Sequence, residues 1–157
     1  MYFPNVTSCT CGNLLKENVE AVVNTVNCVG VMGAGLALQF KQVYPDNFLF
    51  YAEACRVGKT IPGKMLVFDR GVLYNPKYII NFPTKRHWRE KSYLDDIKSG
   101  LASLLETIRE FNIKSIAIPP LGCGLGGLDW GVVKPLILET VRQVPDTRVV
   151  LFDKTVS

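Results

Sequence analysis

The sequence contains no apolar run of about 18 residues or more, so it offers no membrane-spanning helix. Its N-terminus, MYFPNVTSC, lacks the basic and apolar regions of a signal peptide. Internal repeats, low-complexity tracts and long Gly/Ser linkers are also missing. We therefore expect a single cytoplasmic domain, residues 1–157, because this length suits one hydrophobic core.

Metal-binding patterns are missing as well. The five cysteines, at positions 9, 11, 28, 55 and 123, include no CxxC pair, and the chain has one histidine. We expect reduced, mostly structural thiols and no metal centre. The net charge of +4 favours an anionic partner but does not identify it.

Short runs rich in β-branched residues alternate with helical patterns along the whole chain. The first two helices are expected between residue 36 and Gly58, broken at Pro45, the third with Ser92 as its N-cap, and the last from Pro135. This alternation predicts the α/β class, with three layers and a largely parallel sheet. The expected strands are residues 6–10, 21–24, 65–69, 78–82, 115–118 and 148–152.

Seven of the thirteen glycines lie in two segments, residues 30–35 and 122–127, each between a predicted strand and a predicted helix. Glycine permits positive φ and lets backbone N–H groups approach an oxyanion, and a following helix N-terminus favours negative charge. Two such loops can hold a diphosphate, although glycines that only form tight turns are the alternative.

Familiar nucleotide fingerprints fit poorly. The chain lacks GxxxxGK[ST], which argues against a P-loop kinase or ATPase. Residues 122–127 satisfy GxGxxG, but Pro119-Pro120 interrupts the junction with the preceding strand and only about 30 residues remain for a βαβ unit.

The segments VNTVNC (23–28) with GVMGAGLA (30–37), and IPPLGCGL (118–125), resemble the two ligand loops of a macrodomain. The resemblance covers the whole chain. It implies a three-layer α/β/α domain with a mixed, mostly parallel six-stranded sheet that binds ADP-ribose without a metal.

Within the macrodomains, NFPTKRHWR (81–89) is similar to the clade of terminal ADP-ribose glycohydrolases and DarG antitoxins. Lys85 follows a threonine, as the catalytic lysine of the terminal enzymes does. Gly126 occupies the position of their second-loop aspartate and, with LDW, favours DarG. This implies a hydrolase that removes ADP-ribose from thymidine bases of single-stranded DNA, with a DarT-like toxin as partner.

The resemblance, together with side-chain chemistry, nominates the site residues. Lys85 is expected to protonate the departing base or to attack C1″, and Asn27 to orient the distal ribose or the attacking water. Where many macrodomains have Gly-Asp-Ile/Leu for adenine, this chain has Gly12-Asn13-Leu14. The expected ADP-ribose contacts are Asn13, Leu14, Asn24, Gly30, Val31, Met32, Gly33, Gly35, Leu36, Pro120, Gly122, Cys123, Gly124, Leu125 and Gly126.

The basic, aromatic segment 85–91 suits single-stranded nucleic acid, although an ordinary exposed loop is the alternative. We rank His87 below Lys85 as an acid–base group, expect Trp130 to pack, and do not expect Cys123 to be a nucleophile. The expected DNA or base contacts are Thr84, Arg86, His87, Trp88 and Arg89.

Two other functions stay open. One is hydrolysis of ADP-ribose from glutamate carboxylates of proteins, and the other is recognition of ADP-ribose without cleavage. We expect a monomer without membrane contact, either a standalone protein or one domain of a longer antitoxin.

Overall fold

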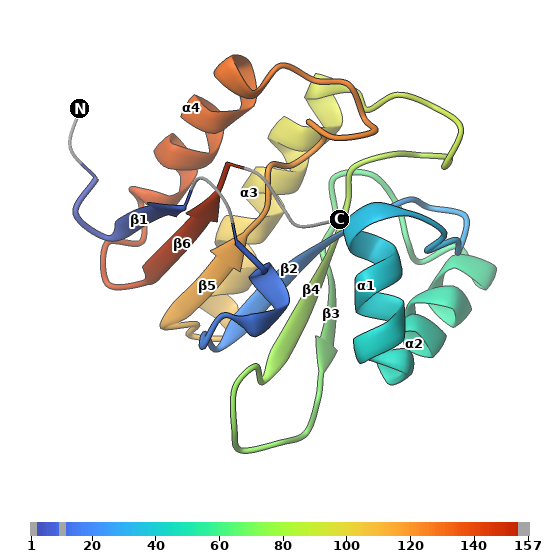
Figure 1. Ribbon diagram of the computed structural model, residues 1–157, viewed down its shortest axis with the longest axis horizontal. Helices are drawn as coiled ribbons and strands as arrows, with labels where there is room; N and C mark the ends of the chain where they lie inside the picture. Colours follow the sequence, from blue (N-terminus) through green and yellow to red (C-terminus); the bar gives the residue numbers. More distant parts are fainter. Residues whose placement is uncertain (1–2, 10–11, 154–157) are drawn as a thin grey trace.

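The computed structural model describes residues 3–9 and 12–153, which form a three-layer α/β/α domain around a six-stranded sheet (Figure 1). The strand order is β1-β6-β5-β2-β4-β3, and all neighbouring strands are parallel except β3 and β4. The strands are β1 (Val6–Cys9), β2 (Ala21–Val26), β3 (Leu66–Asp69), β4 (Tyr78–Pro83), β5 (Ser115–Ile118) and β6 (Arg148–Phe152). The predicted fold class is therefore confirmed; residue 10, the expected end of the first strand, lies outside the described residues.

Helices cover both faces of the sheet, which explains the continuously apolar strands. Residues alternate along β2: Ala21 and Val23 pack on the side of α3 and α4, and Val22 packs on the side of α1. Figure 1 shows α1 and α2 together on one side and α3 and α4 on the other. The helices are α1 (Gly35–Val43), α2 (Pro45–Arg56), α3 (Leu94–Glu110) and α4 (Trp130–Val141), with a 3₁₀ turn, η1, at Leu14–Lys16.

Two expected helix starts need correction. The N-cap position of α3 is Tyr93, one residue after Ser92, whose buried hydroxyl has no hydrogen-bond partner among the described residues. Helix α4 begins at Trp130 and contains Pro135, because Asp129 Oδ1 accepts from Gly131 N at 2.9 Å and already caps the first turn. None of the helices in the described part of the chain is long and apolar enough to cross a membrane.

Candidate active site

The loops that follow β2, β4 and β5 meet at the carboxyl edge of the sheet and enclose a cleft of about 910 Å³. Its size and position are those of a small-molecule site. The lining residues from the end of β2 to the start of α1 are Thr25, Val26, Asn27, Val31, Gly33, Ala34, Gly35, Leu36 and Ala37. Those from the other segments are Thr84, Lys85, Trp88, Pro119, Pro120, Gly122, Cys123, Gly124, Leu125, Gly126, Trp130 and Asp153.

Asn27 fixes the shape of the first glycine loop. Its Nδ2 donates to Val31 O at 2.8 Å, and its Oδ1 accepts from Val29 N at 3.0 Å. The hydroxyl of Tyr51, which is fully buried, lies 2.7 Å from the same Oδ1 and 2.8 Å from Asn27 O. The side-chain amide of Asn27 therefore already has hydrogen-bond partners within the protein, and it stabilises the loop. Because Asn27 also lines the cleft, it is a candidate ligand contact as well.

The second glycine loop leaves three adjacent N–H groups open. Its turns close through Cys123 N to Pro120 O at 3.1 Å and Leu128 N to Gly122 O at 2.9 Å. Within the described residues, the N–H groups of residues 124, 125 and 126 donate to no acceptor. Because these residues line the cleft, the loop offers consecutive donors to a phosphate, as the glycine pattern predicts.

Gly126 is required by its surroundings. A Cβ atom at this position would collide with Ser92 Oγ and would lie 2.5 Å from Gly122 O. Ser92 N also donates to Gly126 O at 3.0 Å, so the segment before α3 is bonded directly to the loop. The space that an aspartate side chain would need is therefore already filled in this chain.

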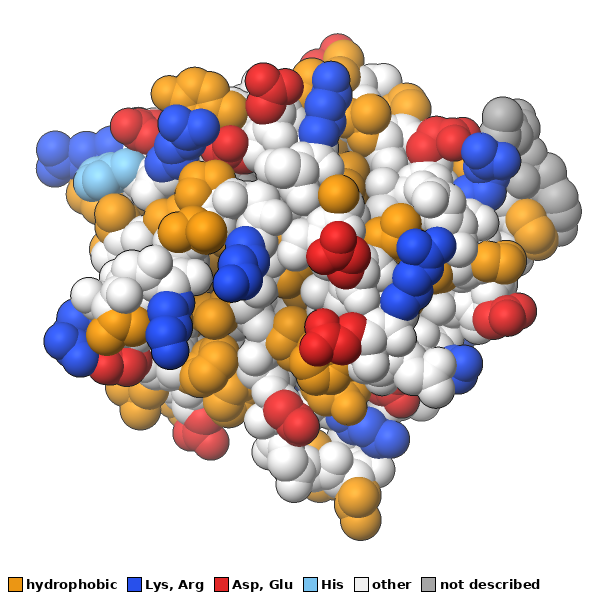
Figure 2. Space-filling view, turned by 180° about the vertical axis from the view of Figure 1, so that it is seen from behind, with side chains coloured by type: hydrophobic (Ala, Val, Ile, Leu, Met, Phe, Trp, Pro, Cys, Tyr) orange, Lys and Arg blue, Asp and Glu red, His pale blue; other side chains and the backbone are white. Residues whose placement is uncertain are grey.

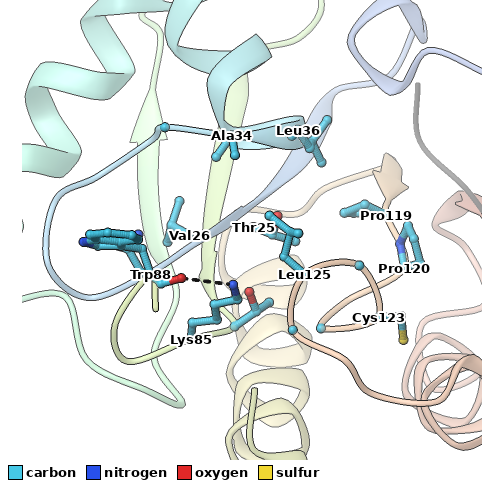
Figure 3. Close-up of a pocket in the computed structure, with 18 of the residues that line it drawn as sticks. Thr25, Val26, Ala34, Leu36, Lys85, Trp88, Pro119, Pro120, Cys123 and Leu125 are labelled. Atoms are coloured by element: carbon cyan, nitrogen blue, oxygen red, sulfur yellow. Dashed lines mark hydrogen bonds between the residues drawn. The ribbon is translucent and has the colours of Figure 1, made fainter. Parts of the chain in front are cut away.

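Lys85 lies at the mouth of the cleft, directly after the buried Thr84. The peptide N–H of Thr84 donates to Val26 O at 2.8 Å, which ties the start of the loop to the end of β2. Lys85 Nζ donates to Trp88 O at 3.4 Å, the interaction drawn in Figure 3. Burial, and secondly the positive charge of Lys91, lower the pKa of Lys85 below its ordinary value. A half-buried amine with a lowered pKa is a suitable proton donor or nucleophile.

Cys123, which lines the cleft, and Cys28, next to Asn27, are poor nucleophiles. Burial raises the pKa of Cys123 to about 11, with a further contribution from Asp129, and its thiol donates to Leu121 O at 3.4 Å. Burial likewise raises the pKa of Cys28 to about 11. Both thiols are protonated near neutral pH, so the geometry favours Lys85 as the reactive group.

The opposite end of the cleft contains a tryptophan and a carboxylate that sequence reasoning missed. Trp130 Nε1 donates to Asp153 Oδ1 at 3.0 Å, and Lys134 Nζ lies 3.3 Å from the same oxygen. Trp130, which we expected only to pack, therefore lines the cleft and also holds Asp153. The available signal was the position of Asp153 directly after the last strand, at the edge where ligands bind.

Several nominated residues lie away from the cleft. Asn24 and Met32 are buried beneath it, and Leu14 is buried in the core next to α1. Asn13 caps η1 by accepting from Leu15 N at 3.0 Å, and Arg86 is paired with Asp96. The structure brings to the cleft fourteen of the twenty-two nominated residues; it does not bring Asn13, Leu14, Asn24, Gly30, Met32, Arg86, His87 and Arg89.

No group of three His, Cys, Asp or Glu residues suited to a metal ion occurs within residues 3–9 and 12–153. The functional groups that line the described site are backbone N–H donors, the Lys85 amine, the Asn27 amide, the Asp153 carboxylate and two tryptophan rings.

Comparison with known proteins identifies the fold family. Residues 23–137 match the family model of the Macro domain. A DNA ADP-ribosyl glycohydrolase of Mycobacterium tuberculosis is 54% identical over 141 residues, which are 90% of this chain and 40% of that protein. The chain thus spans about two fifths of the length of this curated relative.

Solved structures agree with the sequence match. The macrodomain of Mycobacterium tuberculosis DarG superposes with a TM-score of 0.91 at 52% identity, covering 94% of this chain and 96% of that one. Thermosipho africanus DarTG in complex with ADP-ribose gives a TM-score of 0.83 at 32% identity, covering 94% of this chain and 43% of that one. This chain belongs to the Macro domain family.

Proposed function

We propose that this domain binds ADP-ribose and hydrolyses it from thymidine bases of single-stranded DNA. The carrying observation is that Lys85, whose pKa is lowered, lines the same cleft as a loop with three open N–H donors. The relatives named DNA ADP-ribosyl glycohydrolase, at 54% and 49% identity, support the choice of DNA. We further propose that the domain acts in the cytoplasm, within a longer antitoxin and opposite a DarT-like toxin.

The proposed binding mode follows the shape of the cleft. The two glycine loops hold the diphosphate through backbone N–H groups, as helix-linked glycine loops do for other phosphates. The distal ribose then lies between Asn27 and Lys85, with the modified base at the mouth beside Trp88. The adenosine end extends toward Leu36, Trp130 and Asp153.

Hydrolysis breaks the bond between C1″ of the distal ribose and a nitrogen of the base, and water supplies the oxygen that bonds to C1″. The departing base takes up the electron pair of the broken bond and needs a proton. We propose that the Lys85 ammonium donates this proton, and that attack of the neutral amine on C1″ is the competing route. Asn27 holds the loop that positions the ribose.

The test uses a single-stranded oligonucleotide ADP-ribosylated on thymine, incubated without added metal. Wild type is expected to release ADP-ribose, and Lys85→Ala to lose at least about a hundredfold in rate. Lys114→Ala is the matched control, because this exposed lysine lies before β5, at the opposite edge of the sheet from the cleft.

Three results would change the assignment. Release that survives Lys85→Ala would remove Lys85 from the mechanism. Tight binding of ADP-ribose without release from DNA, but with release from a glutamate-modified protein, would indicate the protein glycohydrolase. Tight binding with neither release would indicate a reader of ADP-ribose.

A further inference from the structure

The basic side chains of the loop after β4 have different partners. Arg86 Nε lies 3.0 Å from Asp96 Oδ2 and its Nη2 lies 3.2 Å from Asp96 Oδ1. The same guanidinium lies 4.5 Å from the Tyr93 ring centroid. Asp96, and more weakly Glu90, raise the pKa of Arg86. The positive charge of Arg86 is therefore already paired with Asp96. Glu90, the acidic residue of the loop, acts on the same guanidinium.

Arg89 and Lys91 are arranged differently. Within the described residues, neither side chain forms an ion pair with a carboxylate. The Arg89 guanidinium lies 4.5 Å from the Trp88 ring centroid. Both residues are exposed, so two cations without a carboxylate partner follow the tryptophan in this loop, and Trp88 itself lines the cleft.

Lys91 is held beside the second glycine loop. A Cβ atom on Gly127 would lie 3.3 Å from Lys91 Cδ and 3.6 Å from Lys91 Nζ, so the absence of a side chain there gives the lysine its place. Gly127 also has φ +78°, a conformation that glycine adopts without strain. Burial lowers the pKa of Lys85, and the positive charge of Lys91 lowers it further.

Trp88 has the exposure expected of a stacking platform. It is 46% exposed although it lines the cleft, and the His87 ring stacks on it with centroids 5.5 Å apart and an interplanar angle of 27°. His87 Nδ1 accepts from Arg89 N at 3.1 Å, which orders the turn. In Figure 2 the only histidine lies beside Lys and Arg side chains at one corner of the molecule.

We propose that Trp88, Arg89 and Lys91, here called the strand rim, bind the DNA strand that carries the ADP-ribose. The inference rests on the proposed function and adds a binding surface for the DNA strand outside the cleft. An unpaired base takes the place of the His87 ring against Trp88, and Arg89 and Lys91 each contact a backbone phosphate. An exposed aromatic ring next to cations without carboxylate partners suits single-stranded nucleic acid, because the faces of its bases are not covered by the stack of a duplex. Arg86, despite its place in the same basic segment, takes no part.

The first test measures binding of a short unmodified oligothymidylate across a series of salt concentrations. Arg89→Ala and Lys91→Ala are each expected to weaken binding about fivefold at low salt. Each is also expected to reduce the slope of log affinity against log salt by about 0.7, the loss of one single-strand phosphate contact. Trp88→Ala is expected to weaken binding about tenfold with an unchanged slope, because a stacked base carries no counterion release.

Two controls make the binding test specific. Lys114→Ala removes a positive charge at the far edge of the sheet and is expected to leave affinity and slope unchanged. Arg86→Ala removes a positive charge from the same loop and is expected to keep the wild-type slope, even if the loop loosens and affinity falls. The strand rim is refuted if Arg89→Ala and Lys91→Ala keep the wild-type slope, or if Arg86→Ala lowers it as much as they do.

The second test compares two substrates, the ADP-ribosylated oligonucleotide and ADP-ribosylated thymidine without flanking phosphates. Arg89→Ala and Lys91→Ala are expected to lower kcat/KM at least about fivefold more for the oligonucleotide than for the nucleoside. Equal losses on both substrates would overturn the strand rim while leaving the glycohydrolase in place. If wild type cleaves neither substrate, the proposed hydrolysis fails, and the binding test still decides the strand rim because it needs no turnover.

Discussion

Arg86 and Asp96 join the loop that carries Lys85 to the first turn of α3 by two hydrogen bonds, of 3.0 and 3.2 Å. The carboxylate is largely buried, and the guanidinium covers it from the solvent side. The peptide oxygen of Arg86 also accepts from Cys28 N at 3.3 Å, so the same residue connects to the first glycine loop. The pair thereby fixes the loop from which Lys85 projects.

Breaking this pair should slow the reaction more than it weakens ligand binding. Asp96→Asn retains the shape of the side chain and removes its charge, and we expect kcat to fall about tenfold because Lys85 is held less well. Affinity for free ADP-ribose should change less than kcat. Steady-state kinetics and titration calorimetry measure the two quantities.

The control for this prediction is Glu53→Gln, which removes the charge from the exposed Arg56–Glu53 pair. It should leave kcat at the wild-type value, because an exposed pair of this kind contributes little. A wild-type kcat in Asp96→Asn, or an equal fall in Glu53→Gln, would contradict a positioning role for Arg86 and Asp96.

The pH dependence should report the protonation state of Lys85. If the ammonium is the acid, activity is retained below the Lys85 pKa and lost as pH rises through it. Burial and Lys91 place that pKa below the ordinary value of 10.5, so the loss should begin at a lower pH than for a free lysine. Removing the Lys91 charge with Lys91→Ala should raise the pKa and move the loss to higher pH.

The measurement is a pH profile of kcat on the ADP-ribosylated oligonucleotide for wild type, Lys91→Ala and Lys114→Ala. Lys114→Ala should superpose on wild type because its charge is distant from the cleft. An activity that rises through the same pH range would instead indicate the neutral amine as nucleophile.

Gly126 should tolerate no side chain. Gly126→Ala places a Cβ against Ser92 Oγ and 2.5 Å from Gly122 O, so we expect a loss of about 1–3 kcal/mol in the free energy of unfolding. Gly126→Asp should lower the free energy of unfolding by at least as much, and it should not gain activity on glutamate-linked ADP-ribose. Urea unfolding of both variants measures the loss.

Gly124 provides a matched comparison two residues earlier in the same loop. A Cβ on Gly124 meets no atom within 4 Å, and Gly124 is not among the glycines with positive φ. Gly124→Ala should therefore unfold at nearly the wild-type urea concentration. Equal destabilisation at both positions would show that the loop is sensitive to any substitution, irrespective of the contact with Ser92.

Asn27 should affect binding through the shape of the first glycine loop. Asn27→Ala removes the bonds to Val29 and Val31, and we expect the affinity for ADP-ribose to fall about tenfold because the loop is no longer preorganised. Tyr51→Phe removes only the buried hydroxyl that supports Asn27, which should lower stability by about 1 kcal/mol. Calorimetric titration distinguishes the two; a wild-type affinity in Asn27→Ala would remove this role.

The sheet could be predicted from the sequence because its strands are short β-branched runs buried on both faces. The two glycine loops could be placed because they follow such runs. The pairing of Arg86 with Asp96 could not, since basic character alone does not indicate which cation meets a carboxylate ten residues away on a helix. Asn24 was nominated as a ligand contact, but its amide points into the core, a choice that only packing decides.

Helix boundaries were the other weakness. The pattern from Ser92 to Asp95 resembles a capping box, but Ser92 is bonded through its N–H to Gly126 and lies one residue too early. Pro135 indicates a helix start because it has no N–H to donate, but it lies inside α4, which the Asp129 cap begins at Trp130. The first boundary is set by a contact distant in sequence, and the second by a side-chain cap six residues before the proline.

Three asparagines buried completely between the strands and α2 have a consequence for the site above them. Asn81 accepts from Asn24 at 3.2 Å and from Asn47 at 3.1 Å, and Asn24 and Asn81 are direct partners across β2 and β4. If these strands slipped by one residue, the buried amides would lose their hydrogen-bond partners among apolar side chains. The loops that follow the two strands would also shift relative to one another by about 3.3 Å. The buried amides therefore fix the register of β2 and β4. Asn27 and Lys85, three and four residues further along, line the same cleft only in that register.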